Sequence, residues 1–267
     1  MILGLVKQWI CNSFQERGAA GSPAATVLLE EWVQSERLQS LAKRNDLPET
    51  TYLMALSPNT YQIRWFTPSC EAYFAGHATL AAAYTVFMLG LVQEGTVLFT
   101  CEKGDIKVTQ RGDRLSMPFF KEPIGVPVTT LEIPAALRLV IPTHCLELFL
   151  GRDVVCILPS QRDVETYVPD FLVLSNIPAR GLCITAPGSD TDYVSRFFCP
   201  KYGVPEDPVT GTSHAVIARY WSQRLGKNVV VGRQCSALGG IVHCRVCPEW
   251  TEIEGRVTFS QVSHAIL

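Results

Sequence analysis

The sequence predicts an α/β (α+β) protein of two pseudo-symmetric lobes, each with strands wrapped around one buried helix. The chain has 267 residues, of which 47% are hydrophobic and 18% charged, enough to bury a large core. At roughly 100–150 residues per domain, this length suits two lobes or one large α/β unit. Two apolar helices, expected to begin at Gly76 and Gly211, and a repeated order of motifs around them favour two lobes.

The first predicted elements are two helices. Ser22-Pro23 provides an N-cap followed by a proline suited to the first helical position, so a helix is expected over residues 24–32. A second helix is expected over residues 35–45, where Leu38 and Leu41 recur with helical spacing.

Two strands and a buried helix are expected next. Residues 50–56 and 61–66 are predicted to pair as strands across the turn Ser57-Pro-Asn-Thr60. A helix is predicted from Gly76 to a C-terminal cap at Gly90. It is apolar nearly all round, so it must be enclosed on every side.

The order of motifs around this helix recurs in the second half of the chain. Each half has a proline, a strand, an Arg-aromatic-Phe-X-Pro motif, a loop, a glycine, an apolar helix and a second glycine. The anchors are Leu47-Pro48, Arg64–Pro68, Gly76 and Gly90 in the first half, and Ile177-Pro178, Arg196–Pro200, Gly211 and Gly226 in the second. Four anchors in the same order predict two equivalent lobes.

The boundary between the lobes is expected near residue 113. The prolines of segment 117–134 make it the expected crossover. The sequence therefore predicts an N-terminal lobe over residues 1–113 and a C-terminal lobe over residues 114–267, with the final strands free to cross back to the first lobe.

Charge and hydropathy exclude several classes of partner. The 23 Lys and Arg nearly balance the 25 Asp and Glu, and no basic stripe or nucleic-acid motif is present, so no nucleic-acid partner is expected. The longest apolar stretch, residues 78–92, is shorter than the roughly 18 residues of a spanning helix, so no membrane partner is expected. The start, Met1–Lys7, is too short for a secretory signal, which predicts a cytoplasmic protein.

Ten cysteines, without an export signal, are expected to be mostly reduced thiols in the core. Cys244-Arg-Val-Cys247, with His243 beside it and Cys235 upstream, also allows a zinc site. The segment alternates like a strand, and no second CxxC or HxxxH completes a tetrahedral site. Buried strand cysteines are therefore preferred, and no metal is expected.

Both buried helices begin at a glycine inside a polar cluster, Ala75–Thr79 and Val209–His214. A helix N-terminus carries unpaired N–H donors and about half a positive charge, and glycine lets a carboxylate approach the backbone closely. Two such starts could hold a small carboxylic acid and stabilise an enolate-like charge. The alternative is that each glycine only starts a helix after a loop.

Three further residues are candidates for acid–base chemistry. Glu49 stands just before a strand, where flanking apolar residues could exclude water and suit it to proton transfer; the alternative is a solvated loop acid. Asp207 lies in a loop that the first lobe lacks and could orient a neighbour or cap a helix; the alternative is a turn aspartate that bonds its own backbone. His77, in the first turn of a buried helix, should be neutral and is either a proton donor or acceptor or a core histidine. His214, deeper in its helix, is a weaker candidate.

No Walker loop, GxGxxG, HExxH or GxSxG motif occurs, so nucleotide, dinucleotide, zinc-protease and serine-hydrolase functions lose their usual support. The remaining expectation is acid–base chemistry without a cofactor.

Six segments together resemble the PhzF-like (phenazine biosynthesis PhzF) family, over about residues 10–240. They are Gly21–Ala25, Leu47–Thr51, Arg64–Pro68, Gly76–Leu80, Glu206–Thr212 and Tyr220–Gln223. The resemblance implies the diaminopimelate-epimerase fold, in which each lobe is a mixed, barrel-like sheet around a central helix and the active site lies between the lobes. A homodimer is a separate expectation.

The resemblance also implies roles for single residues. Glu49 matches the family's catalytic acid/base, and His77 and Asp207 match its polar partners. The expected substrate-binding residues, at the two helix starts, are Gly76, Ala78, Gly211, Thr212 and Ser213. Thr212 stands where a serine is usual.

Related epimerases and racemases use two cysteines, one from each lobe. The corresponding positions here are Ala75 and Thr210, and neither can act as a thiolate base. The sequence therefore predicts an isomerase in which one carboxylate moves a proton within a small carboxylated substrate.

Two departures from the family pattern support a rival hypothesis. Ser22 replaces the customary Asn of a Gly-Asn-Pro motif, and segment 257–267 lacks the usual glycine-rich closing strand. The alternative function is a catalytically inactive small-molecule-binding or regulatory protein on the same fold.

Overall fold

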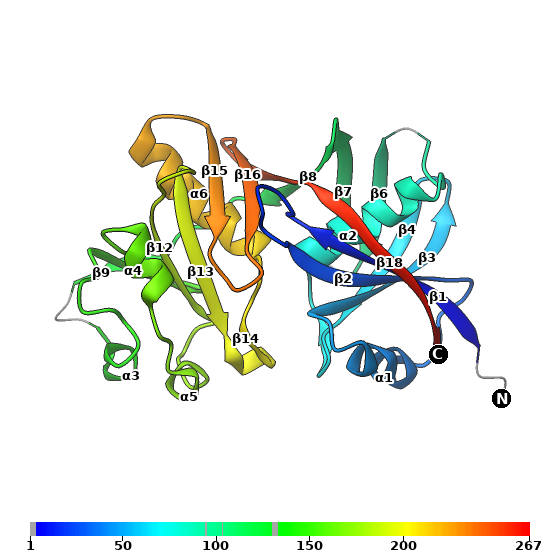
Figure 1. Ribbon diagram of the computed structural model, residues 1–267, viewed down its shortest axis with the longest axis horizontal. Coiled ribbons are helices and arrows are strands. Elements are labelled where there is room, and N and C mark those ends of the chain that lie inside the picture. Colours follow the sequence, from blue (N-terminus) through cyan, green and yellow to red (C-terminus); the bar gives the residue numbers. More distant parts are fainter. Residues whose placement is uncertain (1–3, 94, 103, 130–132) are drawn as a thin grey trace. The chain divides into compact units, whose positions relative to one another are not determined.

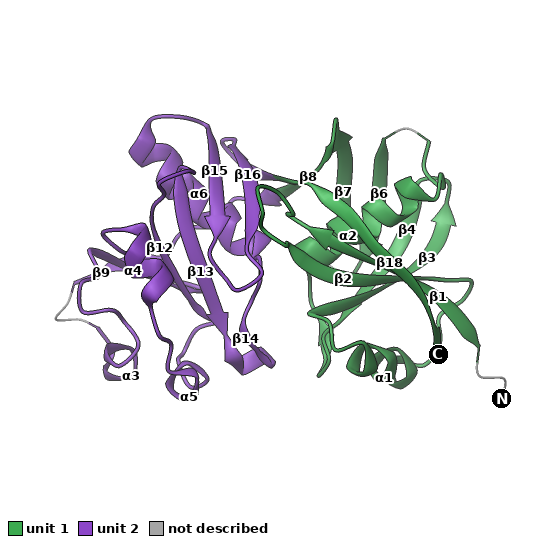
Figure 2. Ribbon diagram, in the orientation of Figure 1, with its two compact units in different colours: residues 1–118, 254–267 green, residues 119–253 purple. Residues whose placement is uncertain are grey.

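A computed structural model describes residues 4–93, 95–102, 104–129 and 133–267 (Figure 1). The chain divides into two compact units, shown in Figure 2. Unit 1 is Met1–Pro118 with Glu254–Leu267, and unit 2 is Phe119–Ile253. Residues 1–3 of the predicted start and residues 130–132 of the predicted crossover lie outside the described residues.

Unit 1 is a curved sheet with one helix on each face. Its helices are α1 (Ser35–Asn45) and α2 (Gly76–Met88). Its strands are β1 (Leu5–Ser13), β2 (Ser22–Leu29), β3 (Glu49–Ser57), β4 (Thr60–Phe66), β5 (Glu71–Ala72), β6 (Thr96–Cys101), β7 (Gly104–Arg111), β8 (Arg114–Phe120) and β18 (Val257–Ile266).

The two faces of this sheet are told apart by side-chain contacts. Trp65 of β4 donates from Nε1 to Thr79 Oγ1 of α2 at 3.1 Å, so one face is covered by α2. Tyr52 of β3 donates from its hydroxyl to the backbone oxygen of Leu38 in α1 at 2.6 Å, so the other face is covered by α1. Thirteen residues long and nearly all buried, α2 is enclosed as its apolar sequence predicts.

The helix expected over residues 24–32 is wrong. Residues Ser22–Leu29 form β2, which pairs antiparallel with β1 and parallel with β3. Ala24 and Ala25 are fully buried between these neighbours. Ladder bonds to two strands outweigh the local cap signal of Ser22-Pro23, because propensity is a weak prior against tertiary packing.

The other elements predicted for the first half are confirmed. α1 and the turn between β3 and β4 lie where the sequence predicts them, and Asn59 in this turn has φ of 64°, a conformation that asparagine tolerates better than most residues. α2 starts at Gly76, and Gly90 has the positive φ of a residue that ends a helix.

Unit 2 contains the second apolar helix, α6 (Gly211–Leu225), and four short helices: α3 (Ala135–Arg138), α4 (Gln161–Thr166), α5 (Phe171–Leu174) and a 3₁₀ turn at Pro200–Tyr202. Its strands are β9 (Val126–Val128), β10 (Glu147–Leu150), β11 (Val154–Ile157), β12 (Leu182–Pro187), β13 (Tyr193–Cys199), β14 (Val204–Glu206), β15 (Val229–Gln234), β16 (Gly240–Val246) and β17 (Trp250–Gly255). α6 packs on β15 and β16 and ends at Gly226 in the left-handed conformation.

The order of strand pairings is the same in both units. In unit 1, β1–β2 is antiparallel, β2–β3 parallel, β3–β4 antiparallel, β4–β6 parallel and β6–β7 antiparallel. In unit 2, β10–β11, β11–β12, β12–β13, β13–β15 and β15–β16 follow the same alternation. The repeated motifs Arg64–Pro68 and Arg196–Pro200 stand at the ends of β4 and β13 in this order.

Candidate active site

Glu49 and His77 lie against each other in unit 1. Glu49 is the first residue of β3, and His77 is the second residue of α2. Glu49 Oε2 is 2.8 Å from His77 Nε2, and the two side chains are 14% and 6% exposed. The distance is that of a hydrogen bond, although the angle is not. The structure thus brings together the two titratable residues predicted for the first lobe.

Strand alternation explains this contact. Glu49 and Thr51 share one face of β3, because alternate residues of a strand point to the same side. Thr51 pairs with Trp65, whose indole bonds Thr79 of α2. Glu49 therefore lies on the face that α2 covers, at the end where the helix begins.

The first turn of α2 offers backbone donors beside this pair. The first helical bond runs from Thr79 N to Ala75 O at 2.9 Å, so the N–H groups of Gly76 and Ala78 have no acceptor within the helix. Ser13 Oγ donates to His77 O at 2.7 Å and holds the turn to β1. The positive end of the helix favours an anion here.

Three buried hydroxyl groups on the same face have no hydrogen-bond partner in the part of the chain that the structure describes. They belong to Ser22 and Thr26 of β2 and to Thr51 of β3, and each residue is 0% exposed. The parallel pairing of β2 with β3 sets Ala24 opposite Glu49 and Thr26 opposite Thr51. An unpaired buried hydroxyl costs about 1–3 kcal/mol, so this face keeps unused polar capacity near Glu49.

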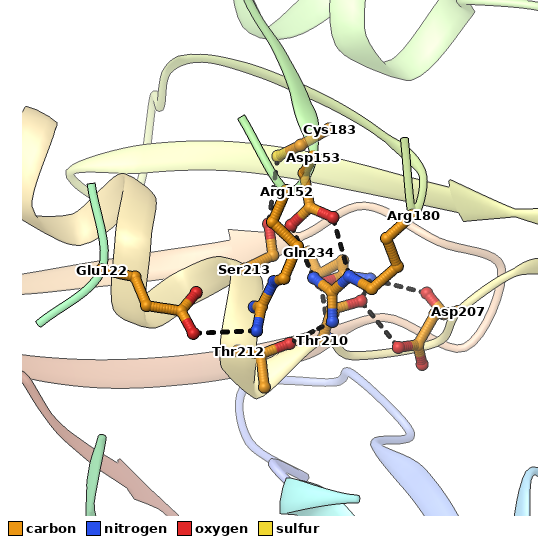
Figure 3. A network of polar contacts seen from close by, with 10 residues as sticks. All are labelled: Glu122, Arg152, Asp153, Arg180, Cys183, Asp207, Thr210, Thr212, Ser213 and Gln234. Atoms are coloured by element: carbon orange, nitrogen blue, oxygen red, sulfur yellow. Dashed lines mark hydrogen bonds and ion pairs between the residues drawn. The ribbon is translucent and has the colours of Figure 1, made fainter. Parts of the chain in front are cut away.

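Asp207, in unit 2, is built into the turn that leads to α6 (Figure 3). Thr210 Oγ1 donates to Asp207 Oδ2 at 2.7 Å, and the backbone N–H of Asp207 donates to Phe197 O at 3.0 Å. Gln234, at the end of β15, donates from Nε2 to the backbone oxygen of Asp207 at 2.6 Å. The Asp207 carboxylate therefore accepts from the Thr210 hydroxyl, and the backbone of Asp207 is bonded by Phe197 and Gln234.

A buried ion pair borders the start of α6. Arg180 donates to both carboxylate oxygens of Asp153, at 2.7 and 2.6 Å, and Asp153 is 7% exposed. A third guanidinium nitrogen donates to Thr212 Oγ1 at 2.8 Å (Figure 3). The guanidinium also lies over the ring of Phe197, 4.7 Å from its centroid. Thr212 is thus tied to a charged pair that the sequence did not predict.

Ser213 points into the core of unit 2. Its Oγ donates to Cys183 Sγ at 3.2 Å, and its backbone N–H donates to Thr210 O at 3.0 Å. Burial raises the pKa of the Cys183 thiol to about 12, so this thiol is neutral at physiological pH. Gly211 is the first residue of α6, so its N–H lies before the first hydrogen bonds of the helix.

His214 is a core residue. Its Nδ1 is 2.8 Å from the hydroxyl oxygen of Tyr193, and the ring is fully buried. Burial lowers the pKa of His214 to about 4, partly offset by the neighbouring Gln234 amide. The ring is therefore neutral near physiological pH.

The three cysteines considered for a zinc site differ in burial. Cys244 of β16 is buried, and Cys235 and Cys247 are half-buried. Among the described residues, no group of three or more His, Cys, Asp or Glu side chains is placed to hold a metal ion. All ten cysteines are free thiols, and five of them are buried: Cys11, Cys156, Cys183, Cys199 and Cys244.

The sequence reasoning missed Asp153, Arg180 and Gln234. No local motif marks them, and each lies near the start of α6 only because the sheet brings it there.

Within the described residues, no helix combines the length and apolar character needed to cross a membrane.

Residues 11–240 match the family model described as phenazine biosynthesis-like protein, PhzC-PhzF. The chain belongs to the phenazine biosynthesis-like family. Two relatives in Pseudomonas aeruginosa, both named uncharacterized isomerases, are each 36% identical to this chain. The alignments cover 91% and 92% of this chain, and 92% and 93% of the relatives.

Solved structures agree with this family assignment. A PhzF-family phenazine biosynthesis protein of Enterococcus faecalis has a TM-score of 0.91 and 32% identity, with 99% of this chain and 100% of that chain covered. A hydroxyproline epimerase of Agrobacterium vitis with bound trans-4-hydroxy-L-proline has a TM-score of 0.63 and 11% identity, covering 98% of this chain and 93% of that chain. The second likeness extends to the fold alone. This phenazine biosynthesis-like chain therefore shares a mixed α/β, sheet-dominated fold with epimerases.

Proposed function

We propose that the protein is a cofactor-independent isomerase that moves a proton within a small carboxylated substrate, with Glu49 as the single acid/base. The observation that carries the proposal is the contact of Glu49 Oε2 with His77 Nε2 at 2.8 Å, on the covered face of the sheet. The isomerase names of the Pseudomonas relatives support the reaction class.

Glu49 acts twice in this reaction. Its carboxylate takes a proton from a carbon whose negative charge can spread into the substrate carboxylate, and the resulting carboxylic acid returns the proton to another carbon of the same molecule. Because the Glu49 side chain is 14% exposed, the proton that it holds can exchange with water between the two transfers. No electron acceptor or metal takes part in this proton balance.

His77 and the start of α2 support Glu49. The imidazole lies against the Glu49 carboxylate, with Nε2 2.8 Å from Oε2. The N–H groups of Gly76 and Ala78 bind the substrate carboxylate, where the positive helix end stabilises the enolate-like charge that develops during proton transfer.

Unit 2 carries further candidate residues. Asp207 is assigned as a polar catalytic partner, and Gly211, Thr212 and Ser213 are assigned to binding. Thr212 keeps its hydroxyl proton for a ligand, because Oγ1 accepts from Arg180. The Ser213 hydroxyl has no proton left to donate to a ligand, because it donates to Cys183.

A two-cysteine racemase is disfavoured in this proposal. Ala75 has no titratable group, and the Thr210 hydroxyl donates to Asp207. One carboxylate that takes and returns a proton on the same side of the substrate suits an isomerisation better than an inversion. We also assign the protein to the cytoplasm, as a homodimer.

Deuterium incorporation in heavy water tests the proposal. The first probes are proline, trans-4-hydroxy-L-proline and methylitaconate, compounds after which racemases, epimerases and isomerases with this fold are named or with which they are bound. They are followed by other small carboxylic acids that stabilise the protein in a thermal-shift screen. Mass spectrometry of each probe should show deuterium entering at carbon with the wild type.

Glu49→Gln should bind the same probe and lose exchange by about 10²–10⁴-fold, the usual contribution of a general base. Glu36→Gln, in the exposed first turn of α1, is the matched control and should exchange at the wild-type rate. Exchange that survives in folded Glu49→Gln protein would assign the base to another residue.

A second candidate function is a ligand-binding or regulatory protein without turnover. The buried Ser22, which replaces the family's usual asparagine two residues before the residue that pairs with Glu49, favours it. Tight binding of a carboxylate probe without deuterium incorporation, in the wild type and in Ser22→Asn, would support this function.

A further inference from the structure

Gln234 is a buried polar residue that ends β15 directly beside Asp207. It is 0% exposed, and β15 pairs with β13 through Ser195 and with β16 through Gly240. Strands on both sides therefore fix the backbone from which the Gln234 amide extends.

The amide of Gln234 bonds both ends of the turn that precedes α6. Its Nε2 donates to Asp207 O at 2.6 Å and lies 3.3 Å from Thr210 Oγ1, and its Oε1 accepts from Thr210 N at 2.9 Å. The same Thr210 donates from its hydroxyl to Asp207 Oδ2 at 2.7 Å (Figure 3). The carboxylate of Asp207 is thus held by a residue that Gln234 itself holds.

The Gln234 amide satisfies both ends of this turn. The backbone N–H of Thr210 is a donor and needs an acceptor, whereas the backbone oxygen of Asp207 is an acceptor and needs a donor. Glutamine provides one of each, and an ionised glutamate provides acceptors only. The residue type at position 234 is therefore set by the turn and not by the packing volume alone.

We propose that Gln234 is a positioning residue, which acts on the substrate through Asp207. This inference rests on the proposed role of Asp207 in catalysis. The strand ladder fixes the amide, the amide fixes the turn from Asp207 to Thr210, and the Thr210 hydroxyl then fixes the Asp207 carboxylate. Displacing a catalytic group by about 1 Å can cost roughly 100-fold in rate, so the turn is a point of control.

Nuclear magnetic resonance tests the positioning without a substrate. In protein labelled with ¹³C at aspartate carboxyl groups, the Asp207 resonance is assigned by its absence in Asp207→Asn. We expect Gln234→Glu and Gln234→Leu to shift this resonance and to speed hydrogen exchange at the Thr210 amide by at least about tenfold, because each variant removes a bond of the turn.

Gln8→Leu is the matched control. Gln8 is 7% exposed in unit 1 and donates to Ser263 Oγ, so its loss removes a buried amide away from Asp207. The Asp207 resonance should stay in place in Gln8→Leu. An unmoved Asp207 resonance in folded Gln234→Leu would overturn the proposal. If Gln234→Leu does not fold, Gln234→Glu, which keeps the size of the side chain, decides.

Deuterium incorporation into the three named probes separates this inference from the proposed function. Gln234→Glu should slow incorporation at least about tenfold, and in the Asp207→Asn background it should slow it no further, because both changes act through one group. Equal losses in both backgrounds would overturn the action through Asp207. Absence of incorporation with the wild type would count against the proposed function, and the resonance of Asp207 would still decide the positioning.

Discussion

In unit 1 the helix that starts at Gly76 sets a histidine against a carboxylate, whereas in unit 2 the helix that starts at Gly211 sets a threonine against an arginine. The strand pairings around the two helices follow the same order, so the frame is shared and the polar residues differ. His77 contacts Glu49, a single acid. Thr212 contacts Arg180, which is already neutralised by Asp153.

The register of the strands shows where unit 2 lacks an acid. Thr51 pairs with Trp65 and Cys183 pairs with Phe197, where the two aromatic residues hold the same place in the repeated motif. Two residues before Thr51 is Glu49, and two residues before Cys183 is Gly181. A Cβ at Gly181 would lie 2.4 Å from Phe198 O, so no side chain fits there.

The difference teaches that a repeated frame can carry one proton-transfer group instead of two. In unit 1, the place beside the helix start holds an acid next to unused hydroxyls. In unit 2, the same place is closed by backbone, and the charges nearby are paired. The comparison therefore supports a single acid/base, and four experiments can break or sharpen it.

The largest effect should be a change in the free energy of unfolding with pH, and it should arise from His214 in the second helix. Because burial lowers the pKa of His214 to about 4 from 6.5, the unfolded chain takes up a proton first as the pH falls. The free energy of unfolding should drop by about 3 kcal/mol between pH 6.5 and pH 4, at about 1.4 kcal/mol per pH unit. Urea unfolding across this range measures it.

His214→Gln should remove most of this slope. Since a variant in the core can fail to fold, the titration of the His214 ring proton in the wild type provides a second measurement. A midpoint near 6.5 would contradict the buried, neutral histidine described for α6.

Crowding the helix starts should show whether both units hold the ligand. Gly76 and Gly211 are in helical conformation, so valine can adopt their backbone angles. Gly76→Val and Gly211→Val should each weaken binding of a carboxylate probe by more than about tenfold, or about 1.4 kcal/mol, because a side chain blocks approach to the N–H groups. Isothermal titration calorimetry, after circular dichroism has verified folding, makes the comparison. Unchanged affinity in Gly211→Val alone would confine the ligand to unit 1.

Asp207→Asn should lower turnover by about tenfold, a smaller loss than that of Glu49→Gln. The amide keeps an acceptor for the Thr210 hydroxyl, so the turn stays in place while the charge is lost. The tenfold loss corresponds to about 1.4 kcal/mol of transition-state stabilisation. Deuterium incorporation into a probe at several pH values measures it, and a wild-type rate would leave Asp207 with a structural role only.

The last effects concern stability and should be equal in the two units. Trp65 Nε1 donates to Thr79 Oγ1 in unit 1, and Trp221 Nε1 donates to Thr185 Oγ1 in unit 2, both in the core. Thr79→Val and Thr185→Val keep the side-chain volume and leave an indole N–H unpaired, so each should cost about 1–3 kcal/mol. Thermal melts compare the two. A loss in one variant only would show that the frames differ in stability as well as in chemistry.

The fold was predictable where the pattern was long and apolar. Both enclosed helices follow from their composition, and their glycine ends follow from the left-handed conformation that glycine adopts without strain. β2 was not predictable from its own residues. Ser22-Pro23 is a good helix start, and only the neighbouring β1 and β3 make the segment a strand.

The candidate site divides in the same way. The contact of Glu49 with His77 joins residues that the motifs had already marked. Gln234, Arg180 and Asp153 carry no local signal, because each is an ordinary polar residue in or beside a strand until the sheet turns it toward α6. Hydrogen bonds across long separations in sequence are what local patterns omit.

The pairing of β1 with β18 makes unit 1 fold in a different order from unit 2. Unit 2 is a continuous stretch of chain, whereas unit 1 needs Leu5–Ser13 and Val257–Ile266 side by side. During synthesis, β1 is made before all of unit 2 and β18 after it. Closing so long a loop is slow and entropically costly. Unit 2 can therefore fold as it emerges from the ribosome, while the edge of β1 still lacks its partner β18. The Glu49–His77 pair therefore belongs to the part of the protein that is completed last.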